Sequence, residues 1–134
     1  MKILQPGGWP RPKGYSNGIS TRGQQIFLAG QIGWDSSQQF PVGGMAAQVG
    51  QALRNIVAVL AEAGARPEHI VRLTWFVTSR DQYLAELPQI GEAYRAVIGK
   101  HFPVMSVVEV SALVESAAKV EIEATAVIPD DNVQ

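Results

Sequence analysis

The stretch "ALRNIVAVLAEAGARPEHIVRLTWFVT", Ala52–Thr78, contains a change of periodicity that decides the fold. Before Gly64 the apolar residues recur at spacings of three and four, and this pattern predicts an amphipathic helix over 44–63. Glycine readily adopts the left-handed backbone conformation that ends many helices. After it, His69–Ser79 is rich in β-branched and aromatic residues, which predicts a strand. The stretch therefore predicts a helix, a tight turn and then a strand.

Further elements are predicted on both sides of this stretch. Upstream, strands over 18–21 and 25–32 flank a short glycine-containing turn, which is typical of a hairpin. Downstream, the apolar spacing predicts a short helix, a break, and a second helix with Pro88 near its first turn. Strands over 106–113 and 119–128 follow, and apolar residues alternate through the second of them. The predicted order is ββαβαββ.

This order indicates an α+β domain in which one sheet carries helices on one face. We expect one domain over 1–134, with 1–14 as an extended arm rich in Pro and Gly and 129–134 as a frayed tail. The second face of the sheet must be polar or covered. Because Thr74 and Phe76 place bulky groups on that face of the third strand, we expect a subunit interface there.

The composition excludes several classes of function. The chain has 134 residues, a formal net charge of −1 and no dense basic run, so phosphate-backbone binding is disfavoured and no nucleic acid partner is expected. The absence of cysteine excludes disulfides, a thiol nucleophile and thiolate metal sites. Pro6, Gly7 and Gly8 interrupt any signal peptide, and no segment approaches the ~20 apolar residues of a membrane span. A cytoplasmic protein is expected.

Several stretches, in order over residues 14–128, together resemble the reactive-intermediate deaminase family, called RidA or YjgF-like. Besides the stretch quoted above they are "GYSNGI" (14–19), "FLAGQIGWD" (27–35), "FPVMSVVEVSAL" (102–113) and "VEIEATAV" (120–127). The resemblance implies a chorismate-mutase-like subunit in a homotrimer, with small-molecule clefts at the subunit interfaces. It also implies hydrolysis of an enamine or imine to ammonia and a keto acid, with no metal and no organic cofactor.

The resemblance also singles out residues of the cleft. Glu121 corresponds to the carboxylate that orients or activates water, although a carboxylate beside Glu123 on a sheet face can also be merely solvated. Trp34, close to the expected cleft, either stacks on a planar ligand or anchors its loop. The remaining substrate-binding candidates are Tyr15, Ala29, Gly30, Gln31, Gly91, Met105 and Ser106.

The sequence departs from the family at three of these positions. Met105 stands where active members carry an arginine that grips the substrate carboxylate through charge-assisted hydrogen bonds. Methionine offers no charge, and it can also serve only to fill space. Ala29 stands where serine is frequent, and Gly91 where asparagine is frequent. We therefore expect weak activity on imino acids from ordinary amino acids, unless Arg11, Lys13 or Arg72 supplies the missing cation.

Other chemistries find little support. His69 and His101 lie far apart with no acidic residue at a ligand-like spacing, so no metal site is predicted. The Gly-x-Ser-x-Gly, P-loop and dinucleotide-binding glycine patterns are missing. Three functions remain open: an enamine or imine deaminase with altered substrate preference, a non-catalytic trimer that binds a metabolite and, less favoured, an endoribonuclease.

Overall fold

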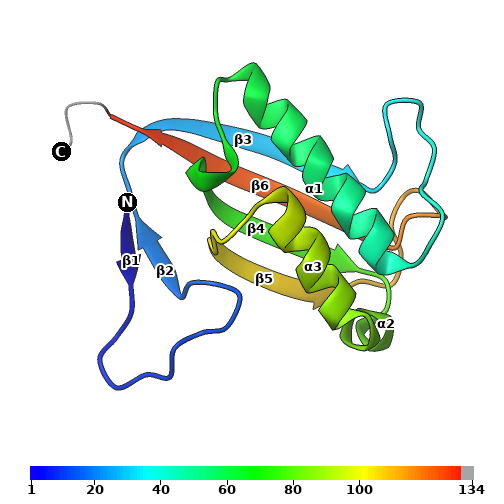
Figure 1. The fold of residues 1–134 in the computed structure, drawn as a ribbon, viewed down its shortest axis with the longest axis horizontal. Coiled ribbons are helices and arrows are strands. Elements are labelled where there is room, and N and C mark those ends of the chain that lie inside the picture. Colours follow the sequence, from blue (N-terminus) through cyan, green and yellow to red (C-terminus); the bar gives the residue numbers. More distant parts are fainter. Residues whose placement is uncertain (131–134) are drawn as a thin grey trace.

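The main sheet is mixed and has the strand order β3-β6-β4-β5 (Figure 1). The structure, a computed structural model, describes residues 1–130. β4 runs parallel to β5, and β6 runs antiparallel to both β3 and β4. The elements are β1 (Lys2–Leu4), β2 (Gly18–Ser20), β3 (Gly23–Ile32), α1 (Met45–Glu62), a 3-10 turn (Pro67–His69), β4 (Ile70–Val77), α2 (Arg80–Ala85), α3 (Leu87–Val97), β5 (Val104–Glu109) and β6 (Val120–Pro129).

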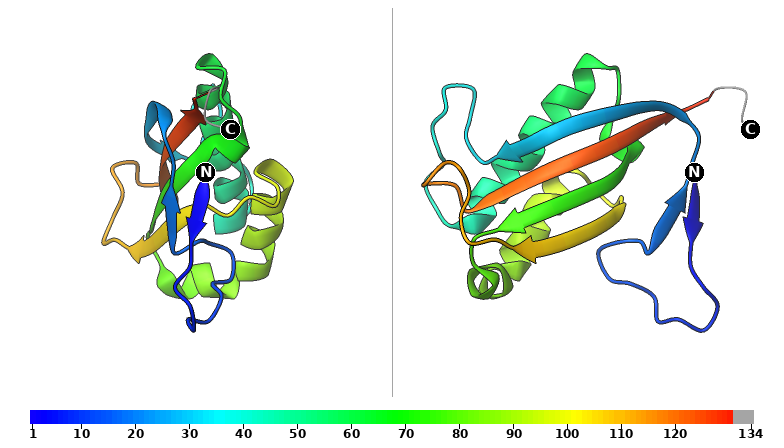
Figure 2. Two further views of the ribbon diagram at one scale, coloured as in Figure 1. Left: turned by 90° about the vertical axis from the view of Figure 1, so that its left-hand side faces the viewer. Right: turned by 180° about the vertical axis from the view of Figure 1, so that it is seen from behind.

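The helices α1 and α3 cover one face of this sheet (Figure 2). The apolar stripe of α1 packs on β3 and β6, and alternate residues of β4 and β6 point toward it, as the sequence periodicity predicts. Gly64 takes a φ of +71° just after α1, which is the predicted left-handed ending. The predicted α+β class is confirmed. The largest fully buried side chains are Met45, Leu53, Ile56, Leu60, Ile70, Leu73 and Ile122.

The predicted hairpin of the first two strands is wrong. β2 pairs instead with β1, through Lys2↔Ser20 and Leu4↔Gly18, in a separate two-stranded sheet. β3 belongs to the main sheet instead and pairs with β6 over almost its whole length, where its apolar residues reach the core. The long ladder buries more apolar surface than a three-residue hairpin strand could. The arm over 1–14 thus contains a strand that the sequence did not indicate.

The last two strands also end at other residues than the sequence predicts. β5 ends at Glu109 rather than at residue 113, and only the Val110 N–H still bonds to β4, at the Val77 carbonyl (2.8 Å). β6 continues through Pro129, so the predicted frayed tail begins no earlier than Asp130. The rest of that tail, 131–134, lies outside the described residues.

The Glu86 carboxylate joins the start of α3 to the start of α1. Glu86, between α2 and α3, accepts hydrogen bonds from the N–H groups of Met45 (3.3 Å) and Ala46 (3.0 Å) at the start of α1, and from Gln82 Nε2 (2.9 Å). These bonds, that from Ala46 first, lower the pKa of Glu86 although burial opposes them. A negative charge is favourable at a helix N-terminus. Glu86 therefore fixes the position of α3 relative to α1.

The second face of the sheet carries a mixed surface that no helix of residues 1–130 covers (Figure 2). Phe27 is 71 % exposed there, and Thr74, Phe76 and Glu121 are only partly exposed. β5 forms one edge of the sheet. The segment that follows the arm reaches the start of that edge, through a bridge between Ser16 and Val104.

Candidate functional site

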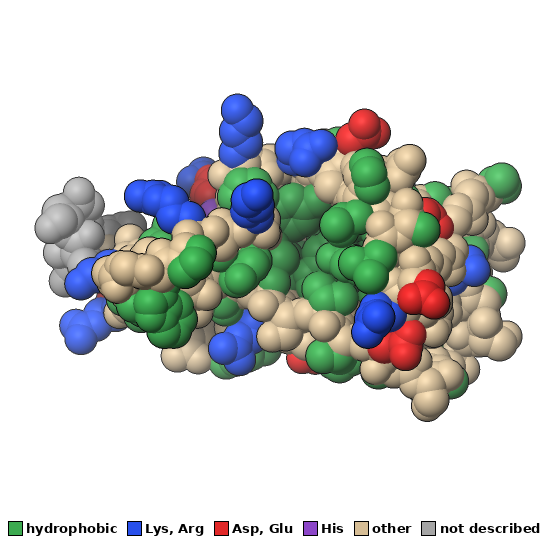
Figure 3. Space-filling model, turned by 90° about the horizontal axis from the view of Figure 1, so that it is seen from below, with side chains coloured by type: hydrophobic (Ala, Val, Ile, Leu, Met, Phe, Trp, Pro, Cys, Tyr) green, Lys and Arg blue, Asp and Glu red, His purple; other side chains and the backbone are tan. Residues whose placement is uncertain are grey.

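A cleft of about 560 Å³ lies between β5, α3 and the end of the N-terminal arm. In a view from the side of the arm and β5, hydrophobic side chains gather in a hollow, with Lys and Arg side chains around it and Asp and Glu side chains near its right-hand end (Figure 3). The residues that line the cleft come from the arm, from β4 and β5, and from the helical segments. They are Lys13, Gly14, Tyr15, Trp75, Tyr83, Leu87, Ile90, Gly91, Tyr94, Arg95, Phe102, Met105 and Val107.

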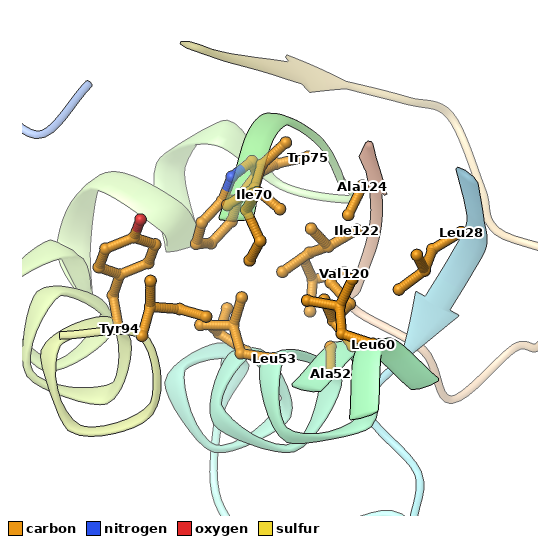
Figure 4. Packing of buried hydrophobic residues seen from close by; sticks show 14 of the residues in the cluster. Leu28, Ala52, Leu53, Leu60, Ile70, Trp75, Tyr94, Val120, Ile122 and Ala124 are labelled. Atoms are coloured by element: carbon orange, nitrogen blue, oxygen red, sulfur yellow. The ribbon is translucent and has the colours of Figure 1, made fainter. Parts of the chain in front are cut away.

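Aromatic side chains form much of this wall. Trp75 of β4 and Tyr94 of α3 lie at the same end of the core, with ring centroids 6.4 Å apart (Figure 4). Tyr94 also stacks on Phe102 at 5.9 Å and donates a hydrogen bond to the carbonyl of His101. Burial raises the pKa of Tyr94 and of Tyr83, so both phenols stay neutral at physiological pH.

One polar atom in this wall has no partner. Trp75 is only 3 % exposed, and its indole Nε1 has no hydrogen-bond acceptor among the described residues. Most buried N–H groups in folded proteins are bonded to protein or water. This donor is therefore buried and unpaired in the wall of the cleft.

Two cations lie at the cleft, and no acidic residue lines it. Lys13 comes from the arm and Arg95 from α3. An added Cβ at Gly91, one helical turn before Arg95, would lie 3.2 Å from Nη1 and 3.9 Å from Cζ of the arginine. The guanidinium thus lies over Gly91, in space that a side chain at that position would occupy.

Three predicted site residues line the cleft together: Tyr15, Gly91 and Met105. Met105 pairs with Leu73 of β4 in the parallel register, so its side chain points to the helix-covered side and packs against the core. Ser106, the next residue, points to the opposite face. It lines a smaller hollow that Tyr15 and Met105 also reach.

The other predicted residues form a second group around Glu121. Val120 and Ile122 are buried under the helices, so Glu121 between them points to the opposite face. An added Cβ at Gly30 would lie 2.4 Å from Glu121 Oε2, so the carboxylate rests directly on the backbone of β3. The ladder between β3 and β6 is irregular here, between Leu28 and Gln31. Gln31 Nε2 donates to the Ala29 carbonyl (3.2 Å).

Within one chain the two groups do not meet. Met105 and Glu121 lie on opposite faces of the sheet, and neither Gly30 nor Glu121 lines the cleft. Trp34 lies with neither group. It packs on Phe40 at 5.9 Å, and its carbonyl accepts from Asn55 Nδ2 (2.8 Å). The contacts of Trp34 anchor its loop, and a role toward a ligand stays a prediction.

The histidines make structural contacts. His69 Nδ1 accepts from the Arg66 N–H (2.9 Å), and His101 Nε2 donates to the Ile70 carbonyl (2.6 Å). Residues 1–130 contain no group of three or more His, Asp or Glu placed to hold a metal ion. None of the helices in that range has the length and apolar character to cross a membrane.

The sequence reasoning missed Arg95 and most of the aromatic wall. The proposed replacement cations were Arg11, Lys13 and Arg72, of which only Lys13 lines the cleft. Arg72 lies on the opposite face, beside Thr74. The spacing from Gly91 to Arg95 was the available signal, because residues four apart share a helix face.

The size and apolar wall of the cleft are typical of sites for small molecules. Fold and cleft together define the class, an α+β protein with a ligand-sized cleft beside an edge strand.

Comparison with known proteins gives the family. Residues 10–128 match the family described as Endoribonuclease L-PSP. A RutC family protein of Synechocystis is 34 % identical over 137 residues, which cover 96 % of this chain and 98 % of the relative. The human 2-iminobutanoate/2-iminopropanoate deaminase is 32 % identical over 103 residues, which cover 76 % and 72 %. The crystal structure of YyfB from Yersinia pestis, a protein of unknown function of the Rid family, has a TM-score of 0.79 and 31 % identity, with 95 % and 98 % covered. The chain therefore belongs to the Endoribonuclease L-PSP (RidA) family, as its resemblance predicted.

Proposed function

We propose that the protein hydrolyses an enamine or imine metabolite at a site that two chains of a homotrimer complete. Water adds to the carbon of the C=N bond, the nitrogen takes up protons, and the C–N bond then breaks to give a carbonyl compound and ammonia. The observation that carries the proposal is the Glu121 carboxylate resting on Gly30. The kinship with a protein named as an iminobutanoate and iminopropanoate deaminase supports it.

In this proposal Glu121 is the general base. The reaction needs a group that removes a proton from water as the oxygen attacks carbon, and later returns a proton toward nitrogen. Glu121 is only partly exposed, and its carboxylate lies against the backbone of β3 at Gly30. Glu123, two residues on, is more exposed and lines a different hollow with Phe27 and Arg72.

The separation of the two groups supports a site shared between chains. The cleft with Met105 and the carboxylate of Glu121 lie on opposite faces of one sheet. Only a second chain can bring such a carboxylate to the mouth of the cleft without refolding. The exposed Phe27 and the partly exposed Phe76 support an interface on the face that carries Glu121, since apolar groups there gain from burial.

Ammonia release tests the proposal. A coupled assay over imines generated from different amines should detect turnover by the wild-type chain. Glu121→Gln keeps the shape of the side chain but removes the base, so turnover should fall by ~10²–10⁴-fold. Glu123→Gln is the matched control and should retain most activity. If Glu121→Gln leaves turnover unchanged, Glu121 is a solvated sheet residue and the mechanism is wrong.

A second candidate function is a non-catalytic trimer that binds a metabolite. Met105 favours it, because the thioether supplies no charge at the position where active relatives hold an arginine. The assay separates the two candidates. A ligand that binds in the cleft while none of the imines is hydrolysed would support the binding function.

A further inference from the structure

The wall of the cleft also indicates which molecules it takes, an inference that rests on the proposed function. Aromatic residues make up 7 % of the chain, yet five of them meet in this one cleft. A small imino acid with two or three carbons beyond its carboxylate cannot cover such a wall. Aromatic rings do cover aromatic walls, in offset-stacked or edge-to-face arrangements. The five residues are Tyr15, Trp75, Tyr83, Tyr94 and Phe102.

The charges at the cleft select an anion. Lys13 and Arg95 both line it, none of the lining residues is acidic, and neither cation forms an ion pair within residues 1–130. The guanidinium of Arg95 lies over Gly91, at the α3 side of the cleft rather than on β5. A planar guanidinium can hold a carboxylate through two parallel hydrogen bonds. Arg95 of α3 therefore supplies the cleft with the positive charge that Met105 lacks.

The buried donor of Trp75 adds a third requirement. Its Nε1 has no acceptor among the described residues, and Figure 4 shows this nitrogen on the side of the ring toward Tyr94, which also lines the cleft. A buried donor without a partner is unfavourable, and a ligand that supplies an acceptor removes that penalty. A ligand that places an acceptor atom against this nitrogen, in addition to its carboxylate, would satisfy the donor.

We propose that the cleft takes an aromatic carboxylate with a hydrogen-bond acceptor close to the ring. Arg95, assisted by Lys13, holds the carboxylate. The ring lies against Tyr94 and Phe102, and the Trp75 indole N–H donates to the acceptor. As a substrate, such a molecule is a 2-imino acid with an aromatic side chain.

Stable 2-oxo acids, the products of imino acid hydrolysis, test this without any turnover. Isothermal titration of the full chain would compare phenylpyruvate with 2-oxobutanoate, which lacks the ring, and with 3-phenylpropan-1-ol, which lacks the carboxylate. We expect phenylpyruvate to bind at least about tenfold more tightly than either, because it alone buries a ring and pairs a charge. Equal affinities for phenylpyruvate and 2-oxobutanoate would overturn the proposal.

Two substitutions locate the contacts. Arg95→Gln should weaken phenylpyruvate binding about tenfold, the usual scale for a charged hydrogen bond, and leave 3-phenylpropan-1-ol unaffected. Arg54→Gln, an exposed arginine of α1 outside the cleft, is the control. Trp75→Phe should weaken binding by roughly fivefold through the lost donor. If Trp75→Phe does not fold, as thermal denaturation would show, Arg95→Gln alone decides.

The remaining outcomes separate this proposal from the proposed function. Tight phenylpyruvate binding without ammonia release from any imine would support the proposed ligand class and contradict the proposed hydrolase activity. Ammonia release that shows no preference for aromatic imines, and no dependence on Arg95, would contradict the proposed ligand class and support the hydrolase activity. If a second copy of the chain fills the cleft instead, none of the three ligands binds and Arg95→Gln changes the sedimentation mass, which would also overturn the proposal.

Discussion

Replacing Gly30 with alanine tests whether the position of Glu121 matters for chemistry. The added Cβ would lie 2.4 Å from Oε2, 2.7 Å from Cδ and 2.8 Å from Cγ of Glu121. All three distances are shorter than 3.0 Å, and Cβ atoms in proteins essentially never come that close to other atoms. The glutamate side chain must therefore move.

The size of the effect follows from the displacement. Relief of the contact needs a shift of roughly 0.6 Å, and misplacement by ~1 Å can cost ~10²-fold in rate, so we expect kcat to fall about 10–100-fold. Ammonia release measures kcat, and thermal denaturation verifies the fold. Gly7→Ala is the control, because nothing lies within 4 Å of an added Cβ there.

A double substitution makes the test stringent. If Gly30→Ala acts only by displacing the carboxylate, adding it to Glu121→Gln should cause little further loss, since effects within one catalytic unit are not additive. If the Gly30→Ala variant is folded and turns over at the wild-type rate, the role given to Glu121 is refuted. Full additivity in the double variant would show that Gly30 acts by another route.

The other predictions concern the cleft, the helix cap and the oligomer. Met105→Arg should tighten 2-oxobutanoate binding by about 10–100-fold in calorimetry, since it restores a charged hydrogen-bond pair; unchanged affinity would show that position 105 does not contact the ligand. Glu86 has a pKa below its usual 4.5, so its stabilising charge is fully present above that value and is lost as pH falls through the lowered folded-state pKa. Glu86→Gln should therefore cost about 1 kcal/mol of unfolding free energy at pH 7 and flatten the loss of stability in acid, as urea titrations at several pH values would show. Sedimentation equilibrium should give three times the 14.5 kDa chain mass, and Phe27→Asp should lower that mass by burying a charge in the interface; a monomeric wild type would contradict the shared site.

The elements that the sequence predicted correctly are those specified by local patterns. The helix, glycine and strand of 52–78 depend on periodicity and on one backbone conformation, and β6 depends on alternation of apolar residues. The pairing of β1 with β2 could not be read in this way. Its three-residue strands are fully exposed or only partly buried, so they carry no apolar alternation.

The candidate site was predicted in part for a similar reason. Family resemblance placed Tyr15, Gly91 and Met105, and these three do meet in the cleft. Arg95 and the aromatic wall come together because α3, β4 and β5 line one cleft, an arrangement that no single stretch of sequence specifies. The separation of the predicted site residues onto two faces of the sheet likewise depends on topology. Alternation along a strand shows that two residues lie on opposite faces, but it does not show which elements cover each face.

The edge strand β5 has a consequence for the chain on its own. Beyond the bridge between Ser16 and Val104, the described residues leave its outer backbone groups unpaired, and Val107 and Val108 are exposed along it. Such an edge is a template onto which another chain can add a strand. Glu109 is the only charged residue of β5, and its carboxylate is engaged by the Arg80 N–H (2.7 Å). A single chain therefore has little protection against aggregation at this edge. If the proposed trimer forms, conditions that separate its subunits should favour fibrous precipitation over a lasting monomer.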